Sequence, residues 1–133
     1  MIPKKELRVG NWVITNENEY LKIETGKLLD QADEFSPVAI SDFILKQCGF
    51  TYDSYFKKWQ LRRNLPQSGF DMELDEDYNL YDFSNHFTGV TFQSLHQMQN
   101  VFYALKGREI EMNFLMFYEK SFDNNVDRAA SGN

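Results

Sequence analysis

One stretch of the chain, Ser94 to Gly107, predicts a helix with both ends marked. Ser94 followed by Gln97 matches a capping box, in which each side chain satisfies a backbone N–H group at the helix start. Gly107 stands where a left-handed C-terminal cap is needed. Apolar side chains recur at helical spacing on one face, which Val101 and Ala104 widen: Leu95, Met98, Phe102 and Leu105. We therefore expect a main helix over residues 94–106 on which the strands pack.

The length and composition predict a folded domain rather than a disordered chain. With 133 residues the chain can form one domain with its own core, which we place at residues 1–121. Twelve Phe, seven Tyr and two Trp supply that core, whereas residues 122–133 lose periodicity and predict a loose tail. Cys48 is the only cysteine, so no disulfide can form within the chain. Together with a polar N-terminal segment, this favours a reducing, cytoplasmic location.

The charge balance narrows the class of partner. The formal net charge is −6 and the sequence pI is about 4.9. Nucleic-acid affinity comes largely from neutralised phosphates, so an acidic chain argues against a general nucleic-acid binder. An acidic surface can instead compete with nucleic acid for a basic protein partner. No apolar run approaches the roughly 18–20 residues that a membrane span needs, so we expect no membrane insertion.

The remaining elements are short. The patterns predict a first hairpin over 12–24, a short helix over 42–48, a second hairpin over 50–61, and strands at 78–83 and 110–118. Ser41 caps the short helix and Gly49 ends it. Residues 25–36 form a polar connection. With strands before and after the main helix, the fold class is α+β: a largely antiparallel sheet, SH3-like or a meander, packed against the main helix.

Three pieces of the sequence resemble a known family. They are Leu7–Val13, Ser41–Phe50 with its Cys-Gly-Phe end, and Leu95–Gly107. They are similar to small proteins of Bacteroidetes prophage and mobile-element regions, which show an "LRIGNWV" opening, a "KCGF" helix end and an "LHQLQNLYFALTG" helix. This chain departs from the pattern with Gln47, Met98, Val101 and Lys106, and in a longer C-terminal strand and tail. The resemblance implies a source in a phage or mobile element, and it carries no activity or catalytic residue.

A polar strip lies on the predicted main helix. His96, Asn100 and Tyr103 are spaced by four and three residues, so they share a helix face beside or opposite the apolar one. This spacing permits a recognition surface for a partner or a small ligand. Hydrogen bonds to neighbouring loops are the plainer interpretation, and the pattern favours it.

An acidic run follows the middle of the chain. Five carboxylates fall within seven residues: Asp71, Glu73, Asp75, Glu76 and Asp77. The run lacks the glycine and the distal glutamate of an EF-hand, so we expect no metal site. Nothing places two carboxylates across a cleft, as glycosidase chemistry would need. We expect a solvated loop, with contact to a basic partner as the functional alternative.

One basic cluster interleaves with aromatic residues. It comprises Lys57, Lys58, Arg62 and Arg63 with Tyr55 and Trp59. In isolation this cluster would suit a phosphate backbone with a stacking platform. On a strand, however, Lys57 and Trp59 share one face and Lys58 and Arg62 the other, so we expect Trp59 in the core and the basic residues split between faces.

No sequence signature of catalysis is present. Cys48 lies on the apolar side of the short helix, which predicts an inert buried thiol. His86 lies in a predicted loop, and neither histidine has metal ligands at convincing spacing. A glycine-rich phosphate loop, a nucleophile elbow and a dinucleotide fingerprint are all missing. We therefore predict no catalytic residue, no cofactor and no metal.

These observations lead to two hypotheses of function. The first is a non-enzymatic protein-interaction module of a phage or mobile element, in one form an acidic inhibitor of a host defence nuclease. The alternative is a small-molecule-binding protein or minor enzyme with a pocket between helix and sheet. The sequence gives no prediction of the oligomeric state.

Overall fold

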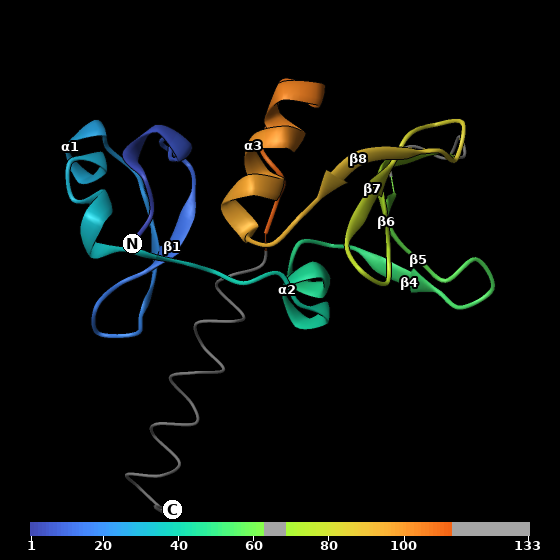
Figure 1. Ribbon diagram of the computed structural model, residues 1–133, viewed down its shortest axis with the longest axis horizontal. Helices are drawn as coiled ribbons and strands as arrows, with labels where there is room; N and C mark the ends of the chain where they lie inside the picture. The colour runs from blue at the N-terminus through green and yellow to red at the C-terminus, as the bar shows by residue number, and fades with distance from the viewer. Residues whose placement is uncertain (63–68, 113–133) are drawn as a thin grey trace, which may run out of the picture.

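The computed structural model describes residues 1–62 and 69–112 (Figure 1). In chain order its elements are a 3-10 helix Lys4–Glu6, β1 Trp12–Ile14, β2 Tyr20–Lys22, α1 Gly26–Leu29, a 3-10 helix Ala32–Glu34, β3 Ser36–Pro37, α2 Asp42–Gln47, β4 Thr51–Asp53, β5 Lys58–Arg62, β6 Phe70–Asp75, β7 Asn79–Tyr81, β8 Phe87–Thr91 and α3 Leu95–Lys106. The expected α+β class with antiparallel strands and one main helix is confirmed.

The strands form two antiparallel sheets. The first is three-stranded in the order β2-β1-β3, and the second is a five-stranded meander in which each strand pairs with the next along the chain, from β4 to β8. Both expected hairpins are present: Val13 pairs with Leu21 in the first, and Tyr52 pairs with Trp59 in the second. In Figure 1 the two sheets lie on opposite sides of α3.

The main helix begins and ends as its sequence predicts. Ser94 and Gln97 form a capping box, in which the Gln97 side chain accepts the Ser94 N–H at 3.1 Å. Gly107 ends the helix in the left-handed conformation, with φ of 70°. Three residues of its apolar face, Leu95, Met98 and Phe102, are fully buried. The fourth, Leu105, was expected to join them but is 63% exposed, because the last helical turn extends beyond the core.

The short helix α2 also follows its sequence signals. The Ser41 hydroxyl accepts the Ile44 N–H at 3.2 Å, which caps the start of the helix. Gly49 adopts a positive φ of 93°, and the next N–H, that of Phe50, bonds to the carbonyl of Leu45 at 3.0 Å. This bond satisfies one of the last helical carbonyls and turns the chain into β4.

Two hydrophobic clusters flank α3. The larger cluster joins α2 and α3 to one face of the five-stranded sheet, through residues that include Leu45, Trp59, Leu74 and Phe102. The smaller cluster fills the space under the three-stranded sheet: Ile2, Leu7, Val13, Ile23, Ala32 and Phe35. The expected tail and the domain end near residue 121 lie outside the described residues.

Three local expectations were wrong. The acidic run was expected to be a solvated loop, but residues 70–75 form β6, with Met72 and Leu74 buried on one face. The connection at 25–36 contains α1, whose N-terminus Thr25 caps, and a 3-10 turn. Residues 87–91, for which the sequence analysis gave no prediction, form β8 with every residue exposed. A strand was also expected from residue 110; residues 110–112 are not in a strand, and 113–118 lie outside the described residues.

Candidate functional site

The predicted interaction strip on α3 faces the N-terminal segment. His96 is buried, and its Nε2 lies 3.3 Å from Oε1 of Glu6. Asn100 accepts a hydrogen bond from Nδ2 of Asn11 at 2.8 Å and donates one to the carbonyl of Glu6 at 2.9 Å. These are hydrogen bonds to neighbouring segments, the plainer interpretation that the sequence favoured for these two residues.

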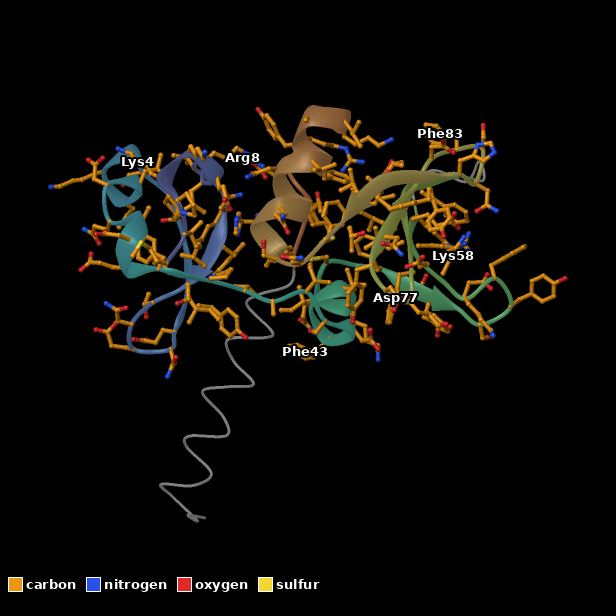
Figure 2. The ribbon with its side chains drawn as sticks, in the orientation of Figure 1. Lys4, Arg8, Phe43, Lys58, Asp77 and Phe83 are labelled. Atoms are coloured by element: carbon orange, nitrogen blue, oxygen red, sulfur yellow. The ribbon has the colours of Figure 1, made fainter. Side chains whose placement is uncertain are left out.

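The third residue of the strip, Tyr103, lies under a charged side chain. The guanidinium of Arg8 sits 4.4 Å from the centroid of the Tyr103 ring. Arg8 also forms a two-pronged ion pair with Glu109, with N–O distances of 2.5 and 3.0 Å. Arg8 thereby holds the N-terminal segment against the C-terminal half of α3. Figure 2 shows Arg8 between the N-terminal segment and α3. Sequence analysis did not identify this role.

Two carboxylates of the acidic run are held by neighbouring side chains. Asp71 accepts a charged hydrogen bond from Arg108 at 2.6 Å and lies 4.0 Å from Nζ of Lys106. Glu73 accepts a hydrogen bond from Nε2 of Gln60 at 2.8 Å. Both carboxylates therefore have intramolecular partners, because β6 sets them beside β5 and the end of α3.

Asp75 organises the turn between β6 and β7. Its carboxylate accepts the backbone N–H groups of Asp77 and Asn79, the side-chain amide of Asn79 and the hydroxyl of Tyr81, at 2.9 to 3.1 Å. Burial raises the pKa of Asp75, but these hydrogen bonds to its ionised form together outweigh burial, and the pKa lies below the ordinary value. The carboxylate is therefore a structural acceptor at neutral pH.

The last two acidic residues lie in that turn. Glu76 accepts the hydroxyl of Tyr52 at 2.9 Å. Asp77 is exposed. Four of the five carboxylates of the run thus accept hydrogen bonds within the chain, which reduces what this segment alone offers to a basic partner.

The alternation holds for Trp59, Lys58 and Arg62, but Lys57 precedes the strand and does not share the face of Trp59. Trp59 is in the core at 4% exposure, whereas Lys58 lies on the other face of β5, with its Nζ 3.8 Å from the centroid of the Tyr81 ring. Lys57 and Tyr55 lie in the exposed β4–β5 turn, and Arg62 stacks on Phe70 at 4.9 Å. Arg63 lies outside the described residues. The described part of the cluster therefore forms no single basic surface.

Neither Cys48 nor His86 forms a reactive site. Cys48 is buried, and burial raises the pKa of its thiol to about 12, so the thiol stays protonated and inert at neutral pH. His86 is exposed in the β7–β8 turn, with Nδ1 3.9 Å from Oδ1 of Asp82. Over residues 1–62 and 69–112, no three His, Cys, Asp or Glu side chains are grouped as metal ligands would be.

A hollow of about 810 Å³, the large hollow, opens between the five-stranded sheet and the C-terminal end of α3. Three of its lining residues sit in register across neighbouring strands: Gln60 of β5, Glu73 of β6 and Tyr81 of β7. Shifts in pairing register within β5–β6 and β7–β8 mark irregularities of the kind that bend strands. Gln60 is buried here. Its amide nitrogen donates to Glu73, and its amide oxygen accepts a hydrogen bond from Arg62.

The rim of the large hollow is apolar and exposed. Phe56 comes from the β4–β5 turn, Phe83 from the β7–β8 turn and Leu105 from the end of α3. Their exposed fractions are 63%, 84% and 63%. Lys106 reaches Phe83, with Nζ 5.3 Å from the ring centroid. Figure 2 shows Phe83 and Lys58 on the same side of α3, far from Phe43.

One sequence signal pointed to this rim. Leu105 continues the apolar periodicity of α3 past the point where the core ends, so its exposure departs from the pattern of its own helix. The sequence analysis placed Phe56 and Phe83 in predicted strands, but both lie in turns, beyond the ends of β5 and β7. The described residues that line the large hollow include no Ser, Cys or His.

Within the described residues, no helix has both the length and the apolar character that crossing a membrane would require. Comparison of the chain with protein-family models, with curated proteins and with solved structures gave no significant match.

Proposed function

We propose that this chain is a non-enzymatic protein-interaction module whose contact surface is the large hollow. One observation carries the proposal: Phe56, Phe83 and Leu105 come from three separate elements and gather, exposed, around one concavity. Exposed apolar groups that cluster beside a hollow are typical of interaction sites, since scattered single residues would need no partner. Aromatic anchors at the centre of an interface supply much of its binding energy.

The charges of the large hollow support a protein partner rather than a nucleic acid. Four carboxylates line it: Asp53, Asp71, Glu73 and Asp82. Three cations line it as well: Lys58, Arg62 and Lys106. A phosphate backbone requires a surplus of cations, whereas this balance is slightly negative. Mixed charges around apolar anchors suit the polar rim of a protein interface.

The same proposal includes an origin in a phage or mobile element and, in one form, inhibition of a host defence nuclease. A phage or mobile-element origin, with action in the cytoplasm, rests on the sequence resemblance and the single cysteine. An inhibitor of a host defence nuclease would present acidic groups to a basic channel. The net charge of −6 supports that form. The acidic run supports it less, because four of its carboxylates have partners within the chain.

The alternative function is small-molecule binding, and the volume of the large hollow favours it as a second candidate. About 810 Å³ falls within the range of roughly 300–1,000 Å³ that is usual for ligand pockets. Its position between the end of α3 and the sheet supports this alternative.

A capture experiment with matched variants tests the first proposal. The wild type, a Phe83→Ala/Leu105→Ala double variant and a Phe43→Ala control are immobilised and exposed to nuclease-treated Bacteroidetes lysate. Phe43 is an exposed aromatic outside the large hollow. We expect one dominant protein to be retained by the wild type and the control and lost by the double variant.

Two outcomes would contradict the proposal. Equal capture by the double variant would mean that the large hollow is not the contact surface. An empty capture together with a thermal shift from one compound of a metabolite panel, abolished in the double variant, would establish the small-molecule alternative. Turnover of that compound would reject the non-enzymatic assignment.

A further inference from the structure

A second concavity, the small hollow, combines aromatic rings with carboxylates. It measures about 490 Å³ and shares no lining residue with the large hollow. It is lined by Asp42 and Lys46 of α2, Tyr52 of β4, Trp59 of β5, and Glu76 and Tyr78 of the β6–β7 turn. Three consecutive elements and a turn more distant in the sequence therefore contribute to one site.

Each carboxylate of the small hollow is held by a tyrosine. The hydroxyl of Tyr78 donates to Oδ1 of Asp42 at 2.8 Å, and the hydroxyl of Tyr52 donates to Oε2 of Glu76 at 2.9 Å. Burial and the bond to Asp42 raise the pKa of Tyr78 to about 12, so this phenol remains a donor at neutral pH. A carboxylate has about four acceptor positions, so each keeps acceptor capacity for a further donor.

The aromatic rings supply the second element of recognition. Tyr52 and Trp59 are opposite each other in the β4–β5 pair, with centroids 5.2 Å apart and planes inclined at 58°. Tyrosine and tryptophan are the best aromatic partners for an organic cation, because their ring faces carry negative potential. The exposed ring of Tyr52, the half-buried ring of Tyr78 and the largely buried ring of Trp59 lie beside two carboxylates, which is the chemical environment of a cation-binding site.

We propose that the small hollow binds an organic cation, a guanidinium or alkylammonium group, between its aromatic rings and the carboxylates of Asp42 and Glu76. The group would come from an arginine or lysine side chain of a protein partner or from a free small cation. Lys46 lines the same hollow, and its positive charge opposes binding. The proposal rests on the geometry of the small hollow and not on the function assigned to the large hollow.

The test follows the indole N–H signal of Trp59 by NMR during titration with three probes. They are N-acetyl-arginine methylamide, N-acetyl-lysine methylamide and tetramethylammonium chloride, at constant ionic strength. We expect saturable shifts with dissociation constants in the millimolar range. A preference for the amino-acid probes assigns the site to a protein side chain, and a preference for tetramethylammonium assigns it to a free cation.

Charge-neutralising variants separate a built site from a general acidic surface. Removing charge-assisted contacts in an Asp42→Asn/Glu76→Gln variant is expected to weaken binding by roughly tenfold or more. Lys46→Gln is expected to strengthen binding. Asp77→Asn, which removes a neighbouring charge outside the lining, is expected to have no effect.

The absence of a saturable shift with all three probes would overturn the proposal. Equal weakening by Asp77→Asn would overturn it as well, since it would show attraction by net charge alone. If the double variant fails to fold, Glu76→Gln alone keeps the test decisive, because Glu76 is exposed in a turn and its loss leaves the core intact.

Discussion

The two sides of α3 contact the rest of the molecule through different chemistry. Toward α2 and the five-stranded sheet, α3 presents fully buried apolar side chains such as Met98 and Phe102. Toward the N-terminal segment it presents Gln99, which is also fully buried. The Gln99 side chain accepts the Trp12 N–H and donates to the Gly10 carbonyl, both at 2.9 Å. One side chain thereby pairs with a backbone N–H and a backbone carbonyl at the start of β1, as the backbone of a neighbouring strand would.

The polar side of α3 holds the N-terminal segment in place. The opening Leu7–Val13 and the helix Leu95–Gly107 are far apart in the sequence but contact each other directly. The residues that make these contacts bond to one another and not to an open site. Buried polar contacts fix one arrangement because a misplaced partner leaves a donor or acceptor unpaired. These contacts therefore determine how the N-terminal segment docks on α3.

The largest loss of stability is expected from substitutions on the apolar side of α3. Phe102→Ala removes a fully buried ring and leaves a cavity, which is expected to lower the free energy of unfolding by about 3–5 kcal/mol. Leu105→Ala, on the same helix but exposed, should change it by less than about 1 kcal/mol. Urea unfolding followed by circular dichroism measures both. A similar loss in the two variants would mean that Leu105 belongs to the core.

The next largest effect is expected on the polar side. Gln99→Ala removes the buried side chain that accepts the Trp12 N–H and donates to the Gly10 carbonyl, which is expected to cost about 2–4 kcal/mol. Gln93→Ala is the matched control, because Gln93 is exposed and its loss should change stability by less than about 0.5 kcal/mol. Equal stability of the two variants in urea unfolding would show that water replaces the Gln99 side chain.

A smaller change in stability is expected at Gly10, where the N-terminal segment approaches Glu109. Gly10 has a φ of 105°, and a Cβ there would lie 2.8 Å from Oε2 of Glu109. Gly10→Ala is therefore expected to destabilise the protein by about 1–2 kcal/mol. Gly26→Ala, where a Cβ meets no atom within 4 Å, should be neutral or stabilising by about 0.5 kcal/mol. Thermal unfolding of both variants gives the comparison, and opposite signs are the expected result.

Local signals in the sequence predicted the elements whose stabilisation is local. The capping box of Ser94 and Gln97 and the glycine cap at Gly107 placed both ends of α3 correctly. Ser41 and Gly49 did the same for α2. Caps of this kind depend on residues within one turn of the helix end, so they can be recognised without knowledge of the fold.

The missed strands show where local reasoning fails. In β6, Met72 and Leu74 alternate with Asp71, Glu73 and Asp75, which is the period of a strand, but the carboxylates suggested a loop. Their partners, such as Arg108 and Gln60, come from distant parts of the chain. In β8, all residues are exposed, so no contrast between faces marked the strand.

The candidate site was the least predictable part. Phe56 and Phe83 lie in different turns, and only the path of the meander and the end of α3 brings them to one hollow. The small hollow likewise joins a helix to a turn more than thirty residues later, as the bond between Asp42 and Tyr78 shows. No spacing rule within one element could have grouped these residues.

The smallest expected change in stability is its dependence on pH, which distinguishes the uncharged polar side of α3 from the β6–β7 turn. The amides of Gln99 and Asn100 do not titrate, whereas the β6–β7 turn depends on the carboxylate of Asp75. Its pKa is lowered in the folded protein, so the folded state binds this proton less readily than the unfolded state. The stabilisation is present above the ordinary carboxyl pKa of 3.8 and is lost as pH falls below it.

The Asp75→Asn variant isolates this dependence. Its deficit in free energy of unfolding relative to the wild type should be complete at pH 7 and should narrow below about pH 4, where the wild-type carboxylate takes up its proton. Urea unfolding at a series of pH values measures the deficit, and Asp77→Asn, in the same turn but exposed, serves as the control. The absence of any deficit at neutral pH would mean that the turn needs only an acceptor oxygen at this position, which asparagine also supplies. The β6–β7 turn would then resemble the polar side of α3, where uncharged amides hold the chain.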